Sequence, residues 1–137
     1  MSNHTMGSNP ILSVLLSNFK IIMDMKYKIV KSFDNQEQDF GFIKVKQLLN
    51  QSDIENLSVS IVKVSGTNKK VVNNRGDAVY YILEGNGMFN IEGEDFVVGS
   101  GDLVYIQKGT PYFDKGELTM ISFNNPRYDQ DSIEYLS

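Results

Sequence analysis

Most of the chain after residue 25 is built from short runs in which β-branched and aromatic residues alternate with polar ones, the two-residue period of strands. Each run ends at Gly, Asn or Asp, residues that favour turns. The pattern predicts many short strands and no long helix in this region, as in a β-sandwich or jelly-roll barrel. The runs lie at 26–33, 40–49, 58–66, 78–87, 88–94, 95–101, 102–109 and 118–123.

Three connections have their own signals. Glu84–Gly87 (EGNG) and Glu92–Glu94 (EGE) are predicted to be tight turns, because Gly and Asn accept a positive φ. Ser52 and Glu55 have the spacing of a capping box, which indicates one helical turn in the stretch SDIENL.

The first 24 residues have a different pattern. From Ile11 to Met23 the apolar residues fall on one face of a helix, so we expect an amphipathic arm that packs on the barrel or on a partner subunit. No Lys or Arg precedes the apolar run, and Lys20 limits it to nine residues, so neither a secretory signal nor a membrane span is expected. A natural start at Met25, with an added extension before it, is the remaining interpretation.

Composition narrows the function classes. The chain of 137 residues suits one domain, and 41% hydrophobic residues suffice for a core. The net charge of −4 does not favour nucleic acid as a partner. The absence of Cys fits a reducing compartment, so a cytoplasmic location is expected. His4 is the single histidine, which excludes a histidine-based triad or a zinc site in the barrel.

The second half of the chain resembles a small single-domain cupin. The two glycines of the first cupin motif fall on Gly66 and Gly85. The residues between them read TNKKV, VNN, RGD, Ala78 and VYYILE. The second motif is matched by Gly101, DLVYI, QKG, TP, Tyr112, FDK and Gly116. The resemblance implies an all-β fold, a cupin-type jelly-roll barrel (double-stranded β-helix) over residues 25–137, preceded by the arm at 1–24. It also implies a homodimer.

The metal-ligand positions that the resemblance assigns carry the wrong residues. They fall on Val72, Asn74, Ala78 and Tyr112, in place of three histidines and a glutamate. A frame shifted by one residue gives Val71 and Asn73 at the first two positions, which does not restore a donor set. The sequence therefore predicts a cupin without the usual metal and with no cofactor. An oxygen-rich Ca²⁺ or Mg²⁺ site from Asp77, Asp114 and Glu84 is left open.

Candidate site residues follow from the frame and from the strand period. Ala78, Tyr80 and Ile82 share one strand face, which the frame places inside the barrel together with Val72 and Asn74. Tyrosine can act as a general acid or base, so the catalytic candidates are Tyr112, Tyr80 and Asp114, with Asp77 as a further acid. The expected ligand-binding residues are Asn74, Tyr80, Tyr105, Gln107 and Tyr112.

Three functions remain open at this stage. The first is a metal-independent cupin that binds a small polar metabolite, a sugar or small organic acid, in an accessory or sensing role. The second is a metal-free isomerase, epimerase or lyase that uses Tyr and Asp side chains. The third is a structural dimeric barrel whose interior is filled by its own side chains. None of the three involves a membrane.

Overall fold

The computed structural model describes residues 26–137, so the expectations for the arm at 1–24 and for a start at Met25 lie outside the described residues. The chain divides into two units, 1–30 and 31–137, and all the strands of the described residues lie in the second unit. Residues 26–30 form no regular element. The second unit contains the candidate site and is described below.

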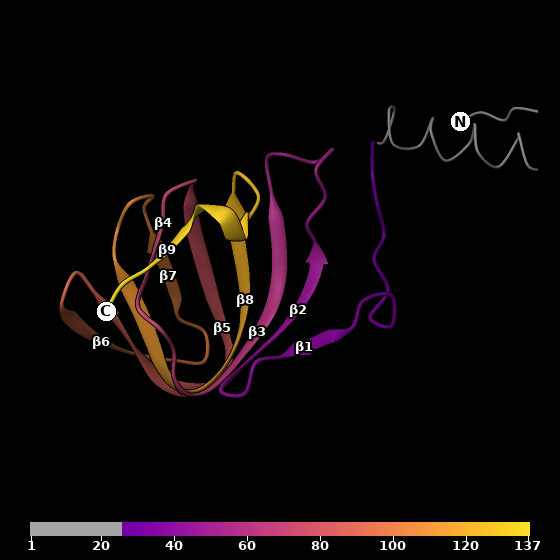
Figure 1. Ribbon diagram of the computed structural model, residues 1–137. Helices are drawn as coiled ribbons and strands as arrows, with labels where there is room; N and C mark the ends of the chain where they lie inside the picture. Colours follow the sequence, from indigo (N-terminus) through magenta and orange to yellow (C-terminus); the bar gives the residue numbers. More distant parts are fainter. Residues whose placement is uncertain (1–25) are drawn as a thin grey trace, which may run out of the picture. The chain divides into compact units, whose positions relative to one another are not determined.

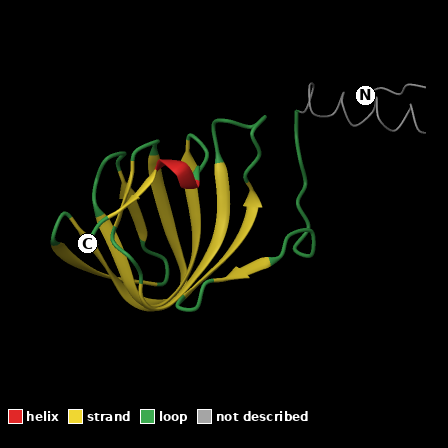
Figure 2. Ribbon diagram, in the orientation of Figure 1, coloured by secondary structure: helices red, strands yellow, loops and turns green. Residues whose placement is uncertain are grey.

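The second unit is built almost entirely from β-strands (Figures 1 and 2), which confirms the all-β expectation. A single 3-10 turn, Gln130–Ser132, interrupts them near the C-terminus. The nine strands are β1 (Glu37–Asp39), β2 (Ile43–Leu49), β3 (Ser58–Thr67), β4 (Val71–Asn73), β5 (Asp77–Ile91), β6 (Glu94–Gly99), β7 (Leu103–Ile106), β8 (Tyr112–Asn125) and β9 (Ile133–Tyr135).

The strands form one antiparallel sheet that curls around a central space (Figure 1). β8 is its central strand, because it pairs along its length with β3 on one side and with β5 on the other. The long strand β5 also pairs with β7 and β6, while β2 and β1 extend the sheet beyond β3. β9 and β4 pair near the chain's end, and β4 meets β8 at Tyr112. The topology thus brings both predicted motifs to one interior.

Two expected elements are absent. Residues 26–33 form no strand, and their apolar side chains Tyr27, Ile29 and Phe33 are exposed, because no neighbouring strand pairs with them. The expected helical turn at 52–57 is replaced by two successive turns. Ser58 already begins β3, so too few residues remain for a helix to grow beyond its nucleus.

The predicted turn at Glu84–Gly87 is wrong, because β5 runs through it without a break. The glycines serve close packing of strands instead. A Cβ on Gly85, whose φ is +98°, would lie 1.9 Å from the carbonyl oxygen of Glu117 on β8. By contrast, the turn at Glu92–Glu94 is confirmed: Glu92 and Gly93 both have positive φ, as a two-residue hairpin between β5 and β6 requires.

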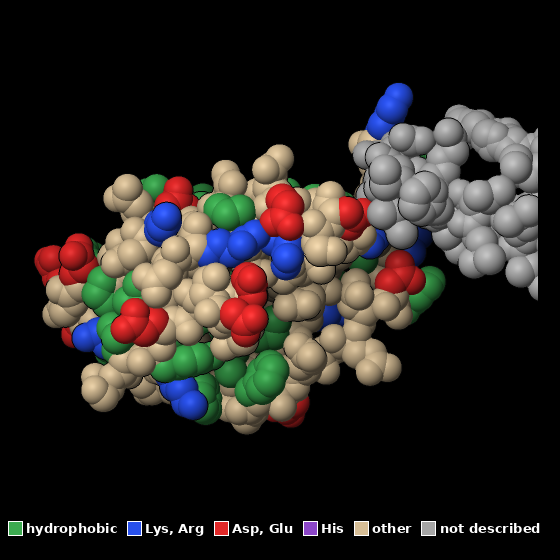
Figure 3. All heavy atoms as spheres, turned by 45° about the horizontal axis from the view of Figure 1, so that its top comes forward, with side chains coloured by type: hydrophobic (Ala, Val, Ile, Leu, Met, Phe, Trp, Pro, Cys, Tyr) green, Lys and Arg blue, Asp and Glu red, His purple; other side chains and the backbone are tan. Residues whose placement is uncertain are grey.

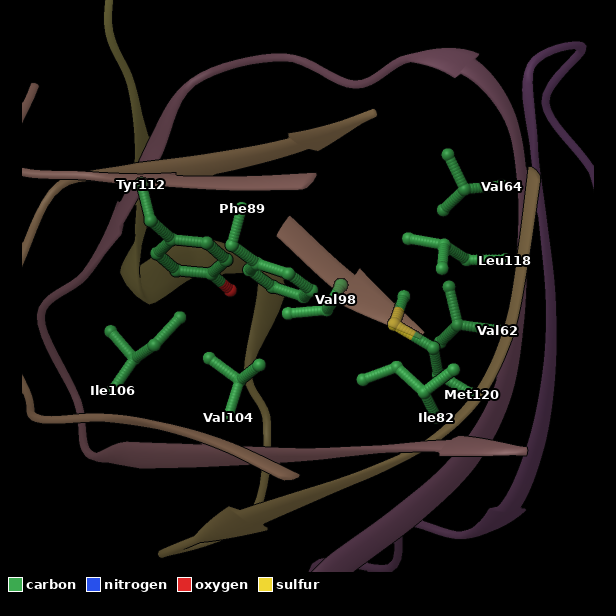
Figure 4. Close-up of a cluster of buried hydrophobic side chains, with 10 residues drawn as sticks. All are labelled: Val62, Val64, Ile82, Phe89, Val98, Val104, Ile106, Tyr112, Leu118 and Met120. Carbon is green, nitrogen blue, oxygen red and sulfur yellow. The ribbon is translucent and has the colours of Figure 1, made fainter. Parts of the chain in front are cut away.

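The core is a cluster of buried apolar side chains in the barrel interior (Figure 4). In the figure, Tyr112 and Phe89 lie together, and Met120, Val62 and Leu118 lie away from them at the other end of the cluster. Ile82, Phe89 and Met120 have no solvent exposure. Inward-facing residues alternate along β8, which is apolar at Leu118 and Met120 and polar at the positions nearer its two ends. The ends of β8 therefore supply the polar side chains that a site requires.

The outer face of the sheet is also apolar over part of its area. Two rows of apolar side chains cross β7, β5, β8 and β3 at paired positions: Tyr105, Val79, Phe123 and Val59 in one, and Leu103, Tyr81, Ile121 and Ile61 in the other. Sheets that face water on one side normally carry polar residues there. Contiguous exposed apolar areas are typical of interaction surfaces. The homodimer expected from the resemblance stays a prediction.

Charged side chains of both signs are interspersed on the face shown in Figure 3. Neither sign dominates a wide area of that face, whereas nucleic-acid binding commonly uses a continuous basic one. Within residues 26–137, no helix has the length and apolar character needed to cross a membrane.

Candidate functional site

The curled sheet encloses an open cavity of about 470 Å³ next to the apolar core. Its walls come from β2, β3, β4, β5 and β8, and residues 128–135 border it near the chain's end. The volume lies in the range of small-molecule sites. The interior is therefore not filled by its own side chains, which rules against the filled-barrel alternative. The polar lining residues are Gln38, Gln47, Ser60, Asn68, Lys69, Asn73, Tyr80, Tyr112, Asp114, Ser122, Asn124, Tyr128, Gln130 and Tyr135.

A pair of tyrosines lies in the cavity wall. The hydroxyl oxygens of Tyr80 on β5 and Tyr112 on β8 are 2.5 Å apart and share a hydrogen bond. Their rings meet edge to face, with centroids 5.9 Å apart, and Phe89 packs against both. Burial raises the pKa of both phenols. The pair therefore stays protonated at neutral pH and can offer one O–H donor and several lone pairs to a ligand.

Asp114 is the carboxylate of the cavity. It lies on β8 two residues after Tyr112, and its side chain is almost fully buried, with 3% exposure for the residue. Its Oδ1 accepts a hydrogen bond of 3.0 Å from the side-chain amide of Asn68. The Asn68 amide is oriented in turn, because its own oxygen accepts the backbone N–H of Lys69. Burial raises the pKa of Asp114 to about 6, and the bond from Asn68 opposes this shift.

A second polar cluster, formed by Asn73, Asn124 and Ser122, lines the same cavity. The Oδ1 of Asn73 accepts the backbone N–H groups of Arg75 and Gly76, which fixes its amide orientation. Its Nδ2 donates to Oδ1 of Asn124 at 3.2 Å, and the Asn124 amide lies 3.4 Å from the hydroxyl of Ser122. Three oriented neutral polar groups therefore extend along the wall from β4 to β8.

Aromatic and amide side chains of the C-terminal segment border the cavity. Tyr128 donates to Gln130 at 2.6 Å, and Gln130 donates to the hydroxyl of Tyr135 at 2.8 Å. Burial raises the pKa of Tyr128 to about 12. The exposed Lys69 places its ammonium 5.6 Å from the centre of the Tyr135 ring, at cation–π distance. This border is therefore held by side-chain contacts among its own residues.

The structure brings together three of the predicted site residues, Tyr80, Tyr112 and Asp114, in one cavity. Three others that were predicted to bind the ligand, Asn74, Tyr105 and Gln107, do not line it. Asn74 is exposed and donates to Glu134, Tyr105 is 57% exposed on the outer face, and Gln107 is exposed after β7. The inward-facing residues of this stretch are Val71 and Asn73, so the assumed frame was shifted by one position on β4.

The two remaining predicted interior residues and the second acid have structural roles. Val72 and Ala78 are buried but do not line the cavity. Asp77 accepts the backbone N–H of Lys108 at 2.8 Å and so anchors the segment after β7. It does not reach the cavity lining.

The donor set does not fit a cupin transition metal. The four positions that the resemblance assigned are Val72, Asn74, Ala78 and Tyr112, of which only Tyr112 lines the cavity. Among the described residues, no group of three or more His, Cys, Asp or Glu side chains could hold a metal ion. The cavity contains one carboxylate and several neutral oxygens, a set that binds first-row metals poorly. The same finding removes support for a calcium or magnesium site at Asp77, Asp114 and Glu84.

Sequence reasoning missed Asn68, Asn73, Ser122, Asn124 and Tyr128. A signal existed for two of them, because Ser122 and Asn124 continue the even-numbered positions of Tyr112 and Asp114 along β8. Asn68 and Tyr128 lie outside the strands, where no periodicity applies. Their positions follow from tertiary packing.

Fold and site together define the second unit as a β-barrel with an internal polar cavity of ligand size. Residues 60–113 match the family model described as Cupin domain, and the chain carries a small cupin domain, as the resemblance implied. An uncharacterized protein of Methanocaldococcus jannaschii is 29% identical over 86 residues, which cover 60% of this chain and 69% of that protein.

Solved structures share the fold. Pac13 of Streptomyces, a nucleoside dehydratase, has a TM-score of 0.73 at 19% identity, covering 82% of this chain and 92% of its own. KdgF from Halomonas sp. has a TM-score of 0.67 at 20% identity, with coverage of 77% and 99%. Ectoine synthase from P. lautus has a TM-score of 0.65 at 15% identity, with coverage of 82% and 91%. At these identities the likeness establishes a cupin-type barrel and no activity.

The buried carboxyl of Asp114 predicts a pH-dependent stability. Its pKa rises from 3.8 to about 6 in the folded chain, so the folded state binds this proton more tightly than the unfolded state. The resulting stabilisation is full below pH 4 and is lost as the pH rises through 6. Relative to Asp114→Asn, the wild type should lose about 2 kcal/mol of unfolding free energy between pH 4 and pH 7.

Urea unfolding of both proteins across this pH range measures the difference. Asp131→Asn, at an exposed position in the 3-10 turn, is the matched control and should show no such change relative to wild type. A stability difference between wild type and Asp114→Asn that stays constant from pH 4 to pH 7 would contradict the burial of this carboxyl.

Proposed function

We propose that this protein binds a small polar metabolite inside its barrel, in an accessory or sensing role and without a metal. The observation that carries the proposal is the open cavity of about 470 Å³, lined by oriented hydroxyl and amide groups beside an apolar floor. A few fixed polar groups in a largely preformed pocket are the usual make-up of a small-molecule site.

The charges in the cavity favour a hydroxyl-rich ligand such as a sugar over an organic acid. The buried ionisable acid is Asp114, and the one basic side chain in the lining, Lys69, is exposed at the border. A ligand carboxylate in the interior would approach Asp114 without a buried cation to compensate it. Tyr80, Tyr112 and Ser122 instead present hydroxyl groups. A hydroxyl group can both donate a hydrogen bond to a ligand hydroxyl and accept one from it.

Chemistry in related folds supports the choice of test compounds. Pac13 is a nucleoside dehydratase and has been crystallised with uridine, a neutral compound with several hydroxyl groups. We therefore include uridine beside glucose, galactose and succinate in a panel. A bound compound should raise the melting temperature by mass action, and glucose, galactose or uridine should do so more than succinate.

Tyr112→Phe tests whether binding uses the tyrosine pair. The substitution removes one hydroxyl of the pair that Tyr80 and Tyr112 form, so affinity for the binding compound should fall about tenfold, the worth of a hydrogen bond at the strong end of the range. Tyr105→Phe on the outer face removes an equal group and should leave the affinity unchanged. Calorimetric titration gives both affinities. Absence of binding by every compound in the panel, or equal losses in the two variants, would contradict the proposal.

A metal-free isomerase, epimerase or lyase is the second candidate function. The observation that favours it is that Tyr80, Tyr112 and Asp114 line one cavity, so hydroxyl donors and a carboxylate base are available together. For this function, Asp114→Asn should abolish turnover of a bound compound while leaving its affinity within a few fold. Product formation followed by NMR distinguishes the candidates, because a binding protein leaves the compound unchanged.

A further inference from the structure

Asp114 is a buried anion that has no cationic partner among residues 26–137. The ion pairs among the described residues join Lys63 to Glu37 and Arg75 and Arg127 to Glu55, and none involves Asp114. The side-chain amide of Asn68 donates a hydrogen bond to its Oδ1, so this neighbour is neutral. The carboxylate lines the cavity, where a ligand can reach it. Buried charges in proteins are normally paired.

We propose that the cavity takes a ligand with a protonated amine, and that the ammonium group of this ligand pairs with Asp114. The inference rests on the proposed function and narrows it from hydroxyl-rich metabolites to those that also carry an amine, such as an amino sugar. The carboxylate of Asp114 supplies the charge-assisted acceptor, and the hydroxyl oxygens of Tyr80 and Tyr112 supply neutral acceptors in the same cavity.

The surroundings of the carboxylate suit a cation. The rings of Tyr80 and Tyr112 line the cavity together with Asp114, and an aromatic face attracts an ammonium group. Phe89 on β5 lies directly opposite Asp114 in the strand register. A desolvated carboxylate attracts an ammonium group more strongly than an exposed carboxylate does, because water does not screen the pair.

Among the described residues, Lys69 is the cation that competes for this position, because it also lines the cavity. Its side chain is directed elsewhere: the ammonium lies over the ring of Tyr135 and makes no ion pair with Asp114. The other titratable groups of the lining are four tyrosines: Tyr80 on β5, Tyr112 on β8, Tyr135 on β9, and Tyr128 in the segment after β8. The pKa values of Tyr80, Tyr112 and Tyr128 are raised, so these three phenols remain neutral below pH 8.

Three ligands that share one ring test the proposal: glucose, glucosamine and glucuronate, which differ in carrying a neutral hydroxyl, an ammonium and a carboxylate group. Calorimetric titration at pH 7 should show glucosamine binding about tenfold more tightly than glucose, as one charge-assisted hydrogen bond predicts. Glucuronate should bind more weakly than glucose. At pH 5 Asp114 is mostly protonated, so the preference for glucosamine should shrink towards equality.

Variants assign the preference to its source. Asp114→Asn should bind glucose and glucosamine equally, whereas Asp131→Asn, an exposed acid outside the cavity lining, should keep the tenfold preference. Lys69→Gln removes the competing cation and should preserve or increase the preference. Glucosamine that binds no better than glucose in wild type, or a preference that survives in Asp114→Asn, overturns the inference. Uridine or glucose binding in that case leaves the proposed function standing, and no binding by any of these compounds overturns both.

Discussion

Gly85→Ala is expected to destabilise the fold by more than about 4 kcal/mol, enough to unfold most of a marginally stable domain. An alanine Cβ would lie 1.9 Å from the carbonyl oxygen and 2.9 Å from the carbonyl carbon of Glu117. Both atoms belong to the backbone of the central strand β8, so no side-chain rotation relieves the clash. The clash is relieved only if β5 and β8 move apart at the paired residues Gly85 and Leu118.

Gly93→Ala is the matched control for this prediction. Gly93 has a similar φ of +85°, but a Cβ there meets no atom within 4 Å. The control carries only the strain of a left-handed residue, about 1–2 kcal/mol. Urea unfolding followed by circular dichroism compares the two variants. Equal losses would show that φ alone constrains Gly85, and would contradict the close approach of β5 to β8.

Phe89→Ala should cost about 3–5 kcal/mol of unfolding free energy, the range for truncating a buried aromatic side chain. Phe89 has no solvent exposure and packs against the rings of Tyr80 and Tyr112, so its loss opens a cavity beneath the candidate site. The remaining rings cannot fill that volume, because strands β5 and β8 fix their backbones.

Phe96→Ala makes the same chemical change at the position that pairs with Phe89 on β6. Phe96 is 44% exposed, so its truncation should cost less than about 1.5 kcal/mol. The difference between the urea midpoints of the two variants measures how much more the Phe89 side chain contributes to stability than the Phe96 side chain does. A loss for Phe89→Ala as small as that for Phe96→Ala would contradict the assignment of Phe89 to the core.

The barrel and most of its strands could be predicted from the sequence, because strand periodicity and turn residues are local signals. The runs at 40–49 and 102–109 contain β2 and β7, and those at 58–66 and 95–101 cover all but one residue of β3 and β6. The failure at Glu84–Gly87 has a clear cause. Glycine permits a turn, but it also permits two backbones to approach closely, and only the partner strand distinguishes these uses.

Three of the eight polar site residues discussed above were found by sequence reasoning. Tyr80, Tyr112 and Asp114 followed from the strand period and from the spacing of the motif glycines. Asn74 was placed inside the barrel in place of Asn73, because a one-residue shift of register moves every side chain to the other face. Asn68 and Tyr128 reach the cavity from segments between strands, where tertiary contacts decide direction.

The account depends on ligand binding inside the barrel, and amide chemical shifts report this most directly. The measurement is an amide correlation spectrum of the labelled protein, titrated with the tightest-binding of glucose, glucosamine and uridine. We predict shifts concentrated at the cavity residues Asn68, Asn73, Tyr112, Asp114 and Ser122, with little change at Tyr81, Leu103 and Tyr105 on the outer face. Shifts confined to the outer face, or no shifts with any of the three compounds, would contradict the account.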